Sequence, residues 1–182
     1  MLIAITGASG ITLAIKLLEK LREKRIKTEL IISKIAEKLI NIESDYTLEE
    51  IHKLADVIYD VNNLTARPAS GSYIIKEMVI IPCSMKTLAA IANGYADNLI
   101  TRAADVMIKE MRKLVLVVRE SPFSAIHLEN MLKLAKLGVV IAPPIPSYYI
   151  KPKSIDDLTD YFVGRVLDHL DIETNLKRWG DI

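Results

Sequence analysis

The chain of 182 residues has a single cysteine, Cys83, and almost no excess of charge of either sign. One cysteine excludes a disulfide within the chain and is typical of a reducing compartment. The 24 basic and 23 acidic residues leave a formal net charge of +1, so no basic field is available for nucleic acid or an anionic membrane surface. His52, His127 and His169 are scattered and give no spacing typical of a zinc site.

Long hydrophobic runs are also absent. Each apolar run has the length of a strand and ends at a charge or a proline, so no membrane-spanning helix is predicted. Met1 leads directly into such a run without a basic segment, which predicts no secretory signal. We therefore expect a cytoplasmic protein. Hydrophobic residues still make up 51% of the chain, with a mean hydropathy of +0.24, which favours some apolar burial between subunits.

Apolar runs alternate with helical patterns along the chain. Strands are expected at residues 2–6, 28–32, 79–82, 114–118 and 139–142, and helices at residues 11–23, 34–42, 48–54, 87–92, 98–111, 125–137 and 155–170. The length and this alternation predict one α/β domain over residues 1–182, with a doubly wound parallel sheet and right-handed crossovers. Residues 60–76 and 143–152 carry prolines and aromatic residues, so we expect two ordered loops there.

Two strand-to-helix junctions carry residues suited to binding an anion. The first is Gly7-Ala8-Ser9-Gly10, and the second runs from Pro82 to Thr87. Open α/β sheets bind ligands where strands end and helices begin, and the free N–H groups there favour phosphate. A phosphorylated ligand is therefore expected, although the first junction also fits a plain tight turn. Ser33 stands where a dinucleotide site would have an acidic residue for the ribose, which favours a mononucleotide such as FMN.

Charged residues at other positions have both a functional and a structural interpretation. Arg102 and Lys109 are seven residues apart and share one face of a predicted helix, which can be a binding face or a solvated surface. Arg119 and Glu120 end a buried strand, where a role in a site is favoured. Cys83 precedes a helix and could be a nucleophile, but packing is the more common role of a lone buried cysteine.

Taken together and in order, the motifs resemble those of the UbiX-type flavin prenyltransferases over nearly the whole chain. The matching motifs are Gly7-Ala-Ser-Gly10, Ser33-Lys34 with Glu43, Ala69-Ser-Gly-Ser72, Pro82-Cys-Ser-Met-Lys-Thr87, Ala92-Asn-Gly94, Asp97-Asn-Leu-Ile-Thr-Arg102, Lys109-Glu110, Arg119-Glu-Ser-Pro122, His127-Leu-Glu-Asn-Met131, Pro146-Ser-Tyr-Tyr149 and Gly164-Arg165-Val-Leu-Asp168. Each motif alone is weak, whereas the ordered set is specific. After Gly10 the family usually has a small residue where this chain has Ile11, a difference that leaves the phosphate turn intact.

The resemblance implies a Rossmann-like (flavodoxin-like) fold in three α/β/α layers and a homo-oligomer, dodecameric in the family. It implies transfer of a dimethylallyl group from dimethylallyl phosphate to N5 and C6 of reduced FMN, without a metal. A UbiD-type decarboxylase would be the partner that receives the prenylated FMN. Whether the donor is a monophosphate or a diphosphate stays open.

The resemblance also implies roles for individual residues. The FMN site would consist of Gly7, Ala8, Ser9, Ser33, Ser84, Met85, Lys86, Thr87 and Arg119. Dimethylallyl phosphate would be held by Tyr149 and Arg165, supported by Ser70, Arg102 and Lys109. The catalytic group would be Glu43, Ser9, Glu120 and Arg119, with Glu43 near the reacting edge of the flavin, reached from a neighbouring subunit. Either Glu120 or the departing phosphate would accept the C6 proton.

Two other functions remain as alternatives. Flavin-dependent cysteine decarboxylases share the predicted fold, but they carry a Pro-Ala-Ser-Ala-Asn-Thr type of turn and a catalytic histidine early in the chain. Here the turn is Pro82-Cys-Ser-Met-Lys-Thr87, and no histidine precedes His52. A non-catalytic flavin-binding module would need the two turns but not Arg102, Lys109, Tyr149 or Arg165.

Overall fold

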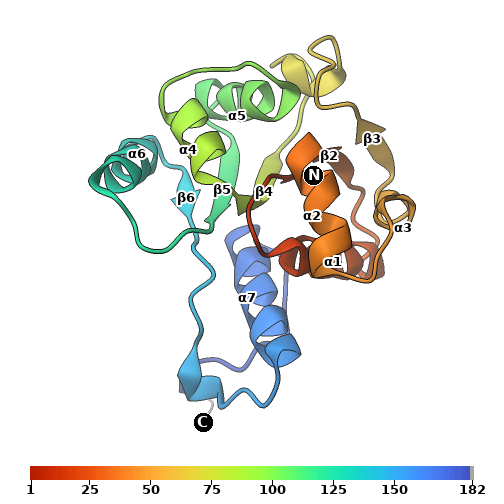
Figure 1. Ribbon diagram of the computed structural model, residues 1–182, viewed down its shortest axis with the longest axis vertical. Helices are drawn as coiled ribbons and strands as arrows, with labels where there is room; N and C mark the ends of the chain where they lie inside the picture. The colour runs from red at the N-terminus through yellow and green to blue at the C-terminus, as the bar shows by residue number, and fades with distance from the viewer. Residues whose placement is uncertain (181–182) are drawn as a thin grey trace.

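The computed structural model describes residues 1–180, and the apolar runs of the sequence pair there as a parallel sheet (Figure 1). Six strands belong to the sheet within these residues: β1 Leu2–Ile5, β2 Glu29–Ile32, β3 Val57–Tyr59, β4 Glu77–Cys83, β5 Lys113–Val118 and β6 Val140–Ile141. Their order is β3-β2-β1-β4-β5-β6, with every neighbouring pair parallel. From β1 the chain adds β2 and β3 on one side, then crosses back and adds β4, β5 and β6 on the other side. The predicted doubly wound sheet is therefore confirmed.

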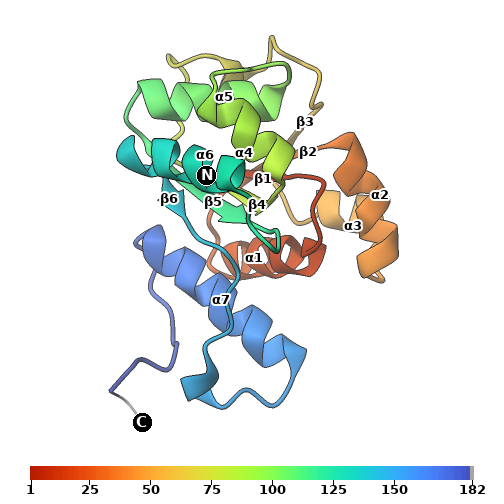
Figure 2. The ribbon, with the colours of Figure 1, turned by 60° about the vertical axis from the view of Figure 1, so that its left-hand side comes forward.

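Helices cover both faces of this sheet (Figure 2). They are α1 Ile11–Glu23, α2 Lys34–Glu43, α3 Leu48–His52, α4 Met85–Ala92, α5 Leu99–Lys109, α6 Ala125–Lys136 and α7 Ile155–His169. Alternate strand residues face opposite sides: Ile3 and Val79 belong to a core with α1 and α7, whereas Leu2 and Met78 belong to a core with α4 and α5. The predicted three α/β/α layers are confirmed.

The edge strand β3 is not among the strands expected from the sequence. It has three residues, of which Val57 and Ile58 are 39% and 42% exposed. An edge strand has one neighbour and one poorly covered face, so its sequence lacks the continuous apolar run that marks β1 or β4. It pairs with β2 from Glu29↔Val57 to Ile31↔Tyr59, and it leads into the expected loop, which contains the short 3-10 helix η1 Arg67–Ala69.

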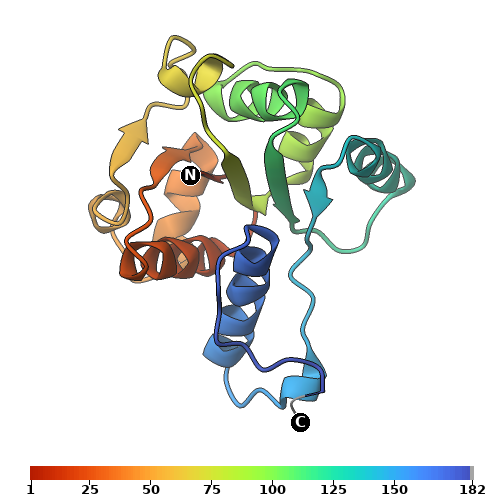
Figure 3. The ribbon, with the colours of Figure 1, turned by 180° about the vertical axis from the view of Figure 1, so that it is seen from behind.

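The carboxyl-terminal part extends away from the sheet (Figure 1). After β6 the chain runs to a second 3-10 helix, η2 Tyr148–Ile150, and returns as α7, which packs against α1. The segment after α7 runs back beside that helix (Figure 3). Gly164 permits this approach, because a Cβ there would lie 2.5 Å from the Leu176 side chain. None of the helices in residues 1–180 combines the length and the apolar character needed to span a membrane.

Candidate active site

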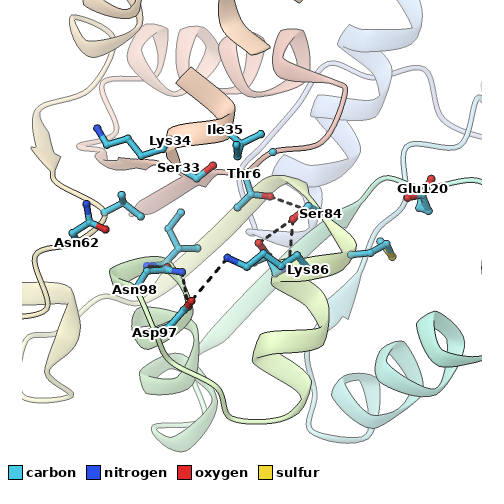
Figure 4. Close-up of a pocket in the computed structure, with 15 residues that line it drawn as sticks. Thr6, Ser33, Lys34, Ile35, Asn62, Ser84, Lys86, Asp97, Asn98 and Glu120 are labelled. Carbon is cyan, nitrogen blue, oxygen red and sulfur yellow. Dashed lines mark hydrogen bonds and ion pairs between the residues drawn. The ribbon is translucent and has the colours of Figure 1, made fainter. Parts of the chain in front are cut away.

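A cavity of about 510 Å³ lies at the carboxyl ends of β1, β2 and β4 (Figure 4). This is the switch point of the sheet, where the crossovers change direction and where open α/β sheets bind their ligands. The volume falls within the range of small-molecule and cofactor sites. The lining residues are Thr6, Gly7, Ser33, Lys34, Ile35, Val61, Asn62, Ser84, Met85, Lys86, Thr87, Asp97, Asn98, Ile100 and Glu120.

The amino end of α4 forms one wall of the cavity. Ser84 caps this helix, since its Oγ accepts a hydrogen bond from the N–H of Thr87 at 3.3 Å and lies 3.1 Å from the Thr87 hydroxyl. The first N–H groups of a helix have no partner within it, so Met85 and Lys86 offer donors to an anion. The Lys86 ammonium lies 3.9 Å from a carboxylate oxygen of Asp97 (Figure 4), so the wall carries both a cation and its counter-charge.

The amino end of α2 forms the opposite wall. Ser33 caps it by accepting a hydrogen bond from the N–H of Ala36 at 3.2 Å. The turn after β1 passes close to this helix at Gly7, where a Cβ would lie only 2.5 Å from Cγ2 of Ile35. Only glycine therefore fits at this approach without moving Ile35.

Glu43 joins the first turn to α2 but does not line the cavity. Its Oε2 accepts hydrogen bonds from the N–H groups of Gly10 at 2.7 Å and Ile11 at 3.0 Å. A carboxylate thereby caps α1, whose N-cap residue Gly10 supplies no side chain and has φ +110°. Ala8 and Ser9 belong to the same turn, partly buried and outside the cavity lining.

Cys83 is fully buried at the end of β4, and its pKa is raised because burial disfavours the thiolate. A buried protonated thiol packs rather than reacts. The neighbouring strand β5 ends beside it: the N–H of Arg119 donates to the carbonyl of Cys83 at 3.1 Å. The side chain of Arg119 is exposed and lies outside the cavity lining, whereas Glu120 lines the cavity and accepts the N–H of Ser121 at 2.9 Å.

The predicted donor-binding residues form two groups outside this cavity. Ser70, Arg102 and Lys109 lie where α5 meets the loop after η1. Nε of Arg102 donates to the carbonyl of Ala69 at 3.0 Å, and the Lys109 ammonium pairs with Glu110. This ion pair lowers the pKa of the Glu110 carboxyl. Arg102 pairs in the same way with Asp105 at 2.7 Å, so each of the two cations of this first group has a carboxylate partner.

The second group, Tyr149 and Arg165, lies on η2 and α7. The Tyr149 hydroxyl is hydrogen-bonded to that of Tyr161, which raises the pKa of Tyr149. Arg165 donates to Asp168 at 2.8 Å and lines a separate cavity of about 180 Å³. Burial acts to raise the pKa of Asp168, but hydrogen bonds from Arg178 and Thr174 outweigh it and hold that pKa below its usual value. Within one chain the predicted site residues thus lie in three places.

Several lining residues were not predicted from the sequence. Thr6 ends the expected strand that leads into the turn at Gly7, and Asp97 begins one of the family motifs. The sequence therefore already placed both residues next to segments assigned to the site. Val61 and Asn62 lie at the start of the ordered loop expected over residues 60–76, but nothing in the sequence placed that loop at this cavity, which it enters after the unpredicted strand β3. Among residues 1–180, no group of three or more His, Cys, Asp or Glu side chains comes close enough to hold a metal ion.

A doubly wound sheet with a cavity at its switch point, walled by two capped helix ends, defines a nucleotide-binding α/β protein. Residues 1–167 match the family model described as Flavoprotein. The chain belongs to this flavoprotein family and, within it, to the UbiX-type flavin prenyltransferases.

Relatives match along their full length. The chain is 50% identical to flavin prenyltransferase UbiX of Methanocaldococcus jannaschii over 100% of this chain and 98% of that protein. It is 51% identical to flavin prenyltransferase LpdB of Lactiplantibacillus plantarum over 97% and 96% of the two chains.

Solved structures show the same architecture. AnUbiX in complex with FMN and dimethylallyl pyrophosphate has a TM-score of 0.96 and 50% identity, covering 98% of this chain and 95% of that one. A dodecameric FMN-dependent UbiX-like decarboxylase from Escherichia coli O157:H7 has a TM-score of 0.96 and 46% identity, covering 98% and 97%. A peptidyl-cysteine decarboxylase, at 16% identity and a TM-score of 0.65, shares the fold alone.

Proposed function

We propose that this chain is a flavin prenyltransferase that moves a dimethylallyl group from dimethylallyl phosphate to N5 and C6 of reduced FMN. The observation that carries the proposal is the switch-point cavity, whose walls are built from the motif residues Gly7, Ser33 and Ser84. Full-length identity of about one half to flavin prenyltransferases supports it. Reduced FMN supplies the nucleophilic atoms, and the protein supplies binding, orientation and charge.

FMN fits the cavity in two respects. The amino end of α4 and the Lys86 ammonium offer N–H donors and positive charge to its phosphate. Gly7 lets the backbone of the first turn approach α2 closely, which leaves room between the two helix ends. Glu120 lines the cavity beside the end of β5 and would accept the C6 proton of the bound flavin.

Ionisation of an allylic phosphate needs cations at the leaving oxygens. Arg102, Lys109, Arg119 and Arg165 are the proposed cations, with Tyr149 and Ser70 as hydrogen-bond donors. Because these residues lie apart in one chain, we propose that neighbouring copies assemble the donor site together. The dodecameric relative supports an assembly of this kind. Glu43 and Ser9 are proposed to act at the same boundary between copies.

The product and the location of the protein complete the proposal. Prenylated FMN would leave for a UbiD-type decarboxylase, which would use it as a cofactor. The single cysteine of this chain favours the cytoplasm as its location.

An anaerobic incubation tests the function directly. Purified protein is mixed with reduced FMN and dimethylallyl phosphate, and the extracted flavin is examined by mass spectrometry. A mass gain of one C5H8 unit is expected, and a parallel reaction with dimethylallyl pyrophosphate compares the donors. Unmodified FMN recovered from a protein that binds it would contradict prenyl transfer and favour a flavin-binding module.

A further inference from the structure

Thr6 links the two strand-to-helix junctions of the cavity through its hydroxyl group (Figure 4). It follows β1 and is 2% exposed. Its Oγ1 donates to the carbonyl oxygen of Pro82 at 2.8 Å and accepts the N–H of Ser84 at 2.9 Å. A carbonyl can only accept and an N–H can only donate, so the direction of both hydrogen bonds is determined.

The link stands just past the end of the ladder between β1 and β4. The ladder between β1 and β4 runs from Leu2↔Met78 to Ala4↔Ile80 and then ends. Pro82 has no N–H and cannot donate to a ladder. On the other side, the pairing of β4 with β5 shifts its register between Ile80 and Cys83. Past the ladder, one backbone bond still joins the two segments, from the N–H of Thr6 to the carbonyl of Pro82 at 3.2 Å. The Thr6 hydroxyl adds a second bond to that carbonyl and extends the connection to the N–H of Ser84.

The residue held by Thr6 is the N-cap of α4. Ser84 has the extended conformation of a cap, φ −73° and ψ 155°, and its hydroxyl accepts the N–H of Thr87. Fixing the N–H of Ser84 therefore fixes the direction in which the next N–H groups, those of Met85 and Lys86, enter the cavity. Valine has the shape of threonine without the hydroxyl. It would leave the part-buried N–H of Ser84 without this acceptor, whereas the Pro82 carbonyl would keep the backbone N–H of residue 6.

We propose that Thr6 is a positioning residue for FMN binding: its hydroxyl holds the α4 cap in the orientation that receives the flavin phosphate. The inference rests on the proposed binding of FMN in this cavity. Thr6 acts through Ser84 and has no part in the transfer of the dimethylallyl group. Its loss is therefore expected to weaken FMN binding and to leave the KM for the prenyl donor unchanged at saturating FMN.

The test compares FMN dissociation constants and melting temperatures of wild type, Thr6→Val, Thr6→Ser and Thr159→Val. Thr159 is a matched control, because its buried hydroxyl donates to the carbonyl of Ile155 within α7. Thr6→Val is expected to weaken FMN binding about tenfold or more, since the N–H of the capping residue Ser84 loses its acceptor. Thr6→Ser keeps the hydroxyl and should restore the affinity, and Thr159→Val should bind FMN like wild type.

Three outcomes overturn the inference. Equal affinity of Thr6→Val and wild type would show that the link is structural only, and equal loss in Thr6→Val and Thr6→Ser would show that the hydroxyl is not the cause. If Thr6→Val does not fold, amide hydrogen exchange of FMN-free wild type decides: slow exchange at Ser84 supports the link, and fast exchange refutes it. Failure of wild type to bind FMN would instead refute the proposed function, on which this inference depends.

Discussion

Oε2 of Glu43 accepts the N–H of Gly10 at 2.7 Å, so the last residue of α2 caps the first turn of α1. The same oxygen accepts the N–H of Ile11. One carboxylate thus binds the end of the turn after β1, and the start of the same turn, at Thr6 and Gly7, lines the cavity. This capping role of Glu43 is compatible with the catalytic role proposed for it at an interface between subunits.

Replacing Glu43 is expected to destabilise the fold. Glu43→Ala removes both hydrogen bonds and the charge at the helix end, and we expect the free energy of unfolding to fall by about 1–2 kcal/mol. Glu43→Gln keeps an acceptor oxygen and should lose less. Urea denaturation measures both. Unchanged stability of Glu43→Ala would mean that the cap contributes nothing in solution.

Ser84→Ala is expected to affect both stability and FMN binding. Loss of the α4 cap should lower the free energy of unfolding by about 1 kcal/mol. Ser124→Ala is the matched control, because Ser124 caps α6 in the same way, through the N–H of His127, and lies outside the cavity lining. The control should lose similar stability and keep its FMN affinity, measured by flavin fluorescence titration. Equal FMN affinities of the two variants would contradict a binding role of the α4 cap.

Gly7→Ala tests the close approach of the first turn to α2. The added Cβ would lie 2.5 Å from Cγ2 of Ile35, and overpacking of this kind costs about 1–3 kcal/mol. Ile35 must then move, and it lines the cavity, so FMN binding should weaken as well. The double variant Gly7→Ala/Ile35→Gly removes both Cγ2 and the Cβ that would lie 2.8 Å from the added Cβ, and it is expected to regain most of the affinity. If the double variant binds no better than Gly7→Ala, the clash is not the cause.

Cys83 is expected to be unreactive in the folded protein. Its thiol should react with a thiol-specific dye only after unfolding, and Cys83→Ala should still transfer the prenyl group. The folded-state pKa of the thiol is raised above its unfolded value, so folding stability is complete below the unfolded pKa and falls as the pH rises beyond it. Cys83→Ala should lose this alkaline decrease, which denaturation at two alkaline pH values measures.

Arg165→Ala separates prenyl transfer from flavin binding. Arg165 lies on α7, outside the cavity at the switch point, so FMN affinity is expected to stay at the wild-type value. Turnover should fall by about a hundredfold or more, because a cation at the leaving phosphate is lost. Arg22→Ala serves as the control, since Arg22 is bound to the carbonyl of Lys53. Full activity of Arg165→Ala would favour a flavin-binding module or a different donor site.

Long buried elements could be predicted from the sequence, because their pattern is local. Helix α1 was predicted with the bounds that it has, and β1, whose four residues are all fully buried, differs by one residue at its end. The edge strand β3 could not be predicted, because three half-exposed residues carry no periodic signal. Its pairing with β2 depends on a neighbour far from it in sequence.

The candidate site shows the same limit. The junctions that hold Gly7 and Ser84 were predicted to bind a ligand because open α/β sheets bind ligands where strands end, whereas Ser33 was placed in the FMN site by the family resemblance. The bond from Thr6 to Ser84 spans 78 residues, and no pattern within either segment indicates it. Likewise, the distance of Tyr149 and Arg165 from the cavity follows from the extended course of the chain between β6 and α7, which the sequence pattern does not encode.

The contact between the carboxyl-terminal segment and η2 gives this protein an intrinsic optical reporter. Trp179 is the sole tryptophan of the chain, and its ring meets that of Tyr149 edge-on with centroids 5.3 Å apart. Indole emission depends on the polarity around the ring, so selective excitation of tryptophan reports the surroundings of Trp179, which include the Tyr149 ring. Addition of a prenyl donor to the FMN-free protein can therefore be followed at this one position without a label.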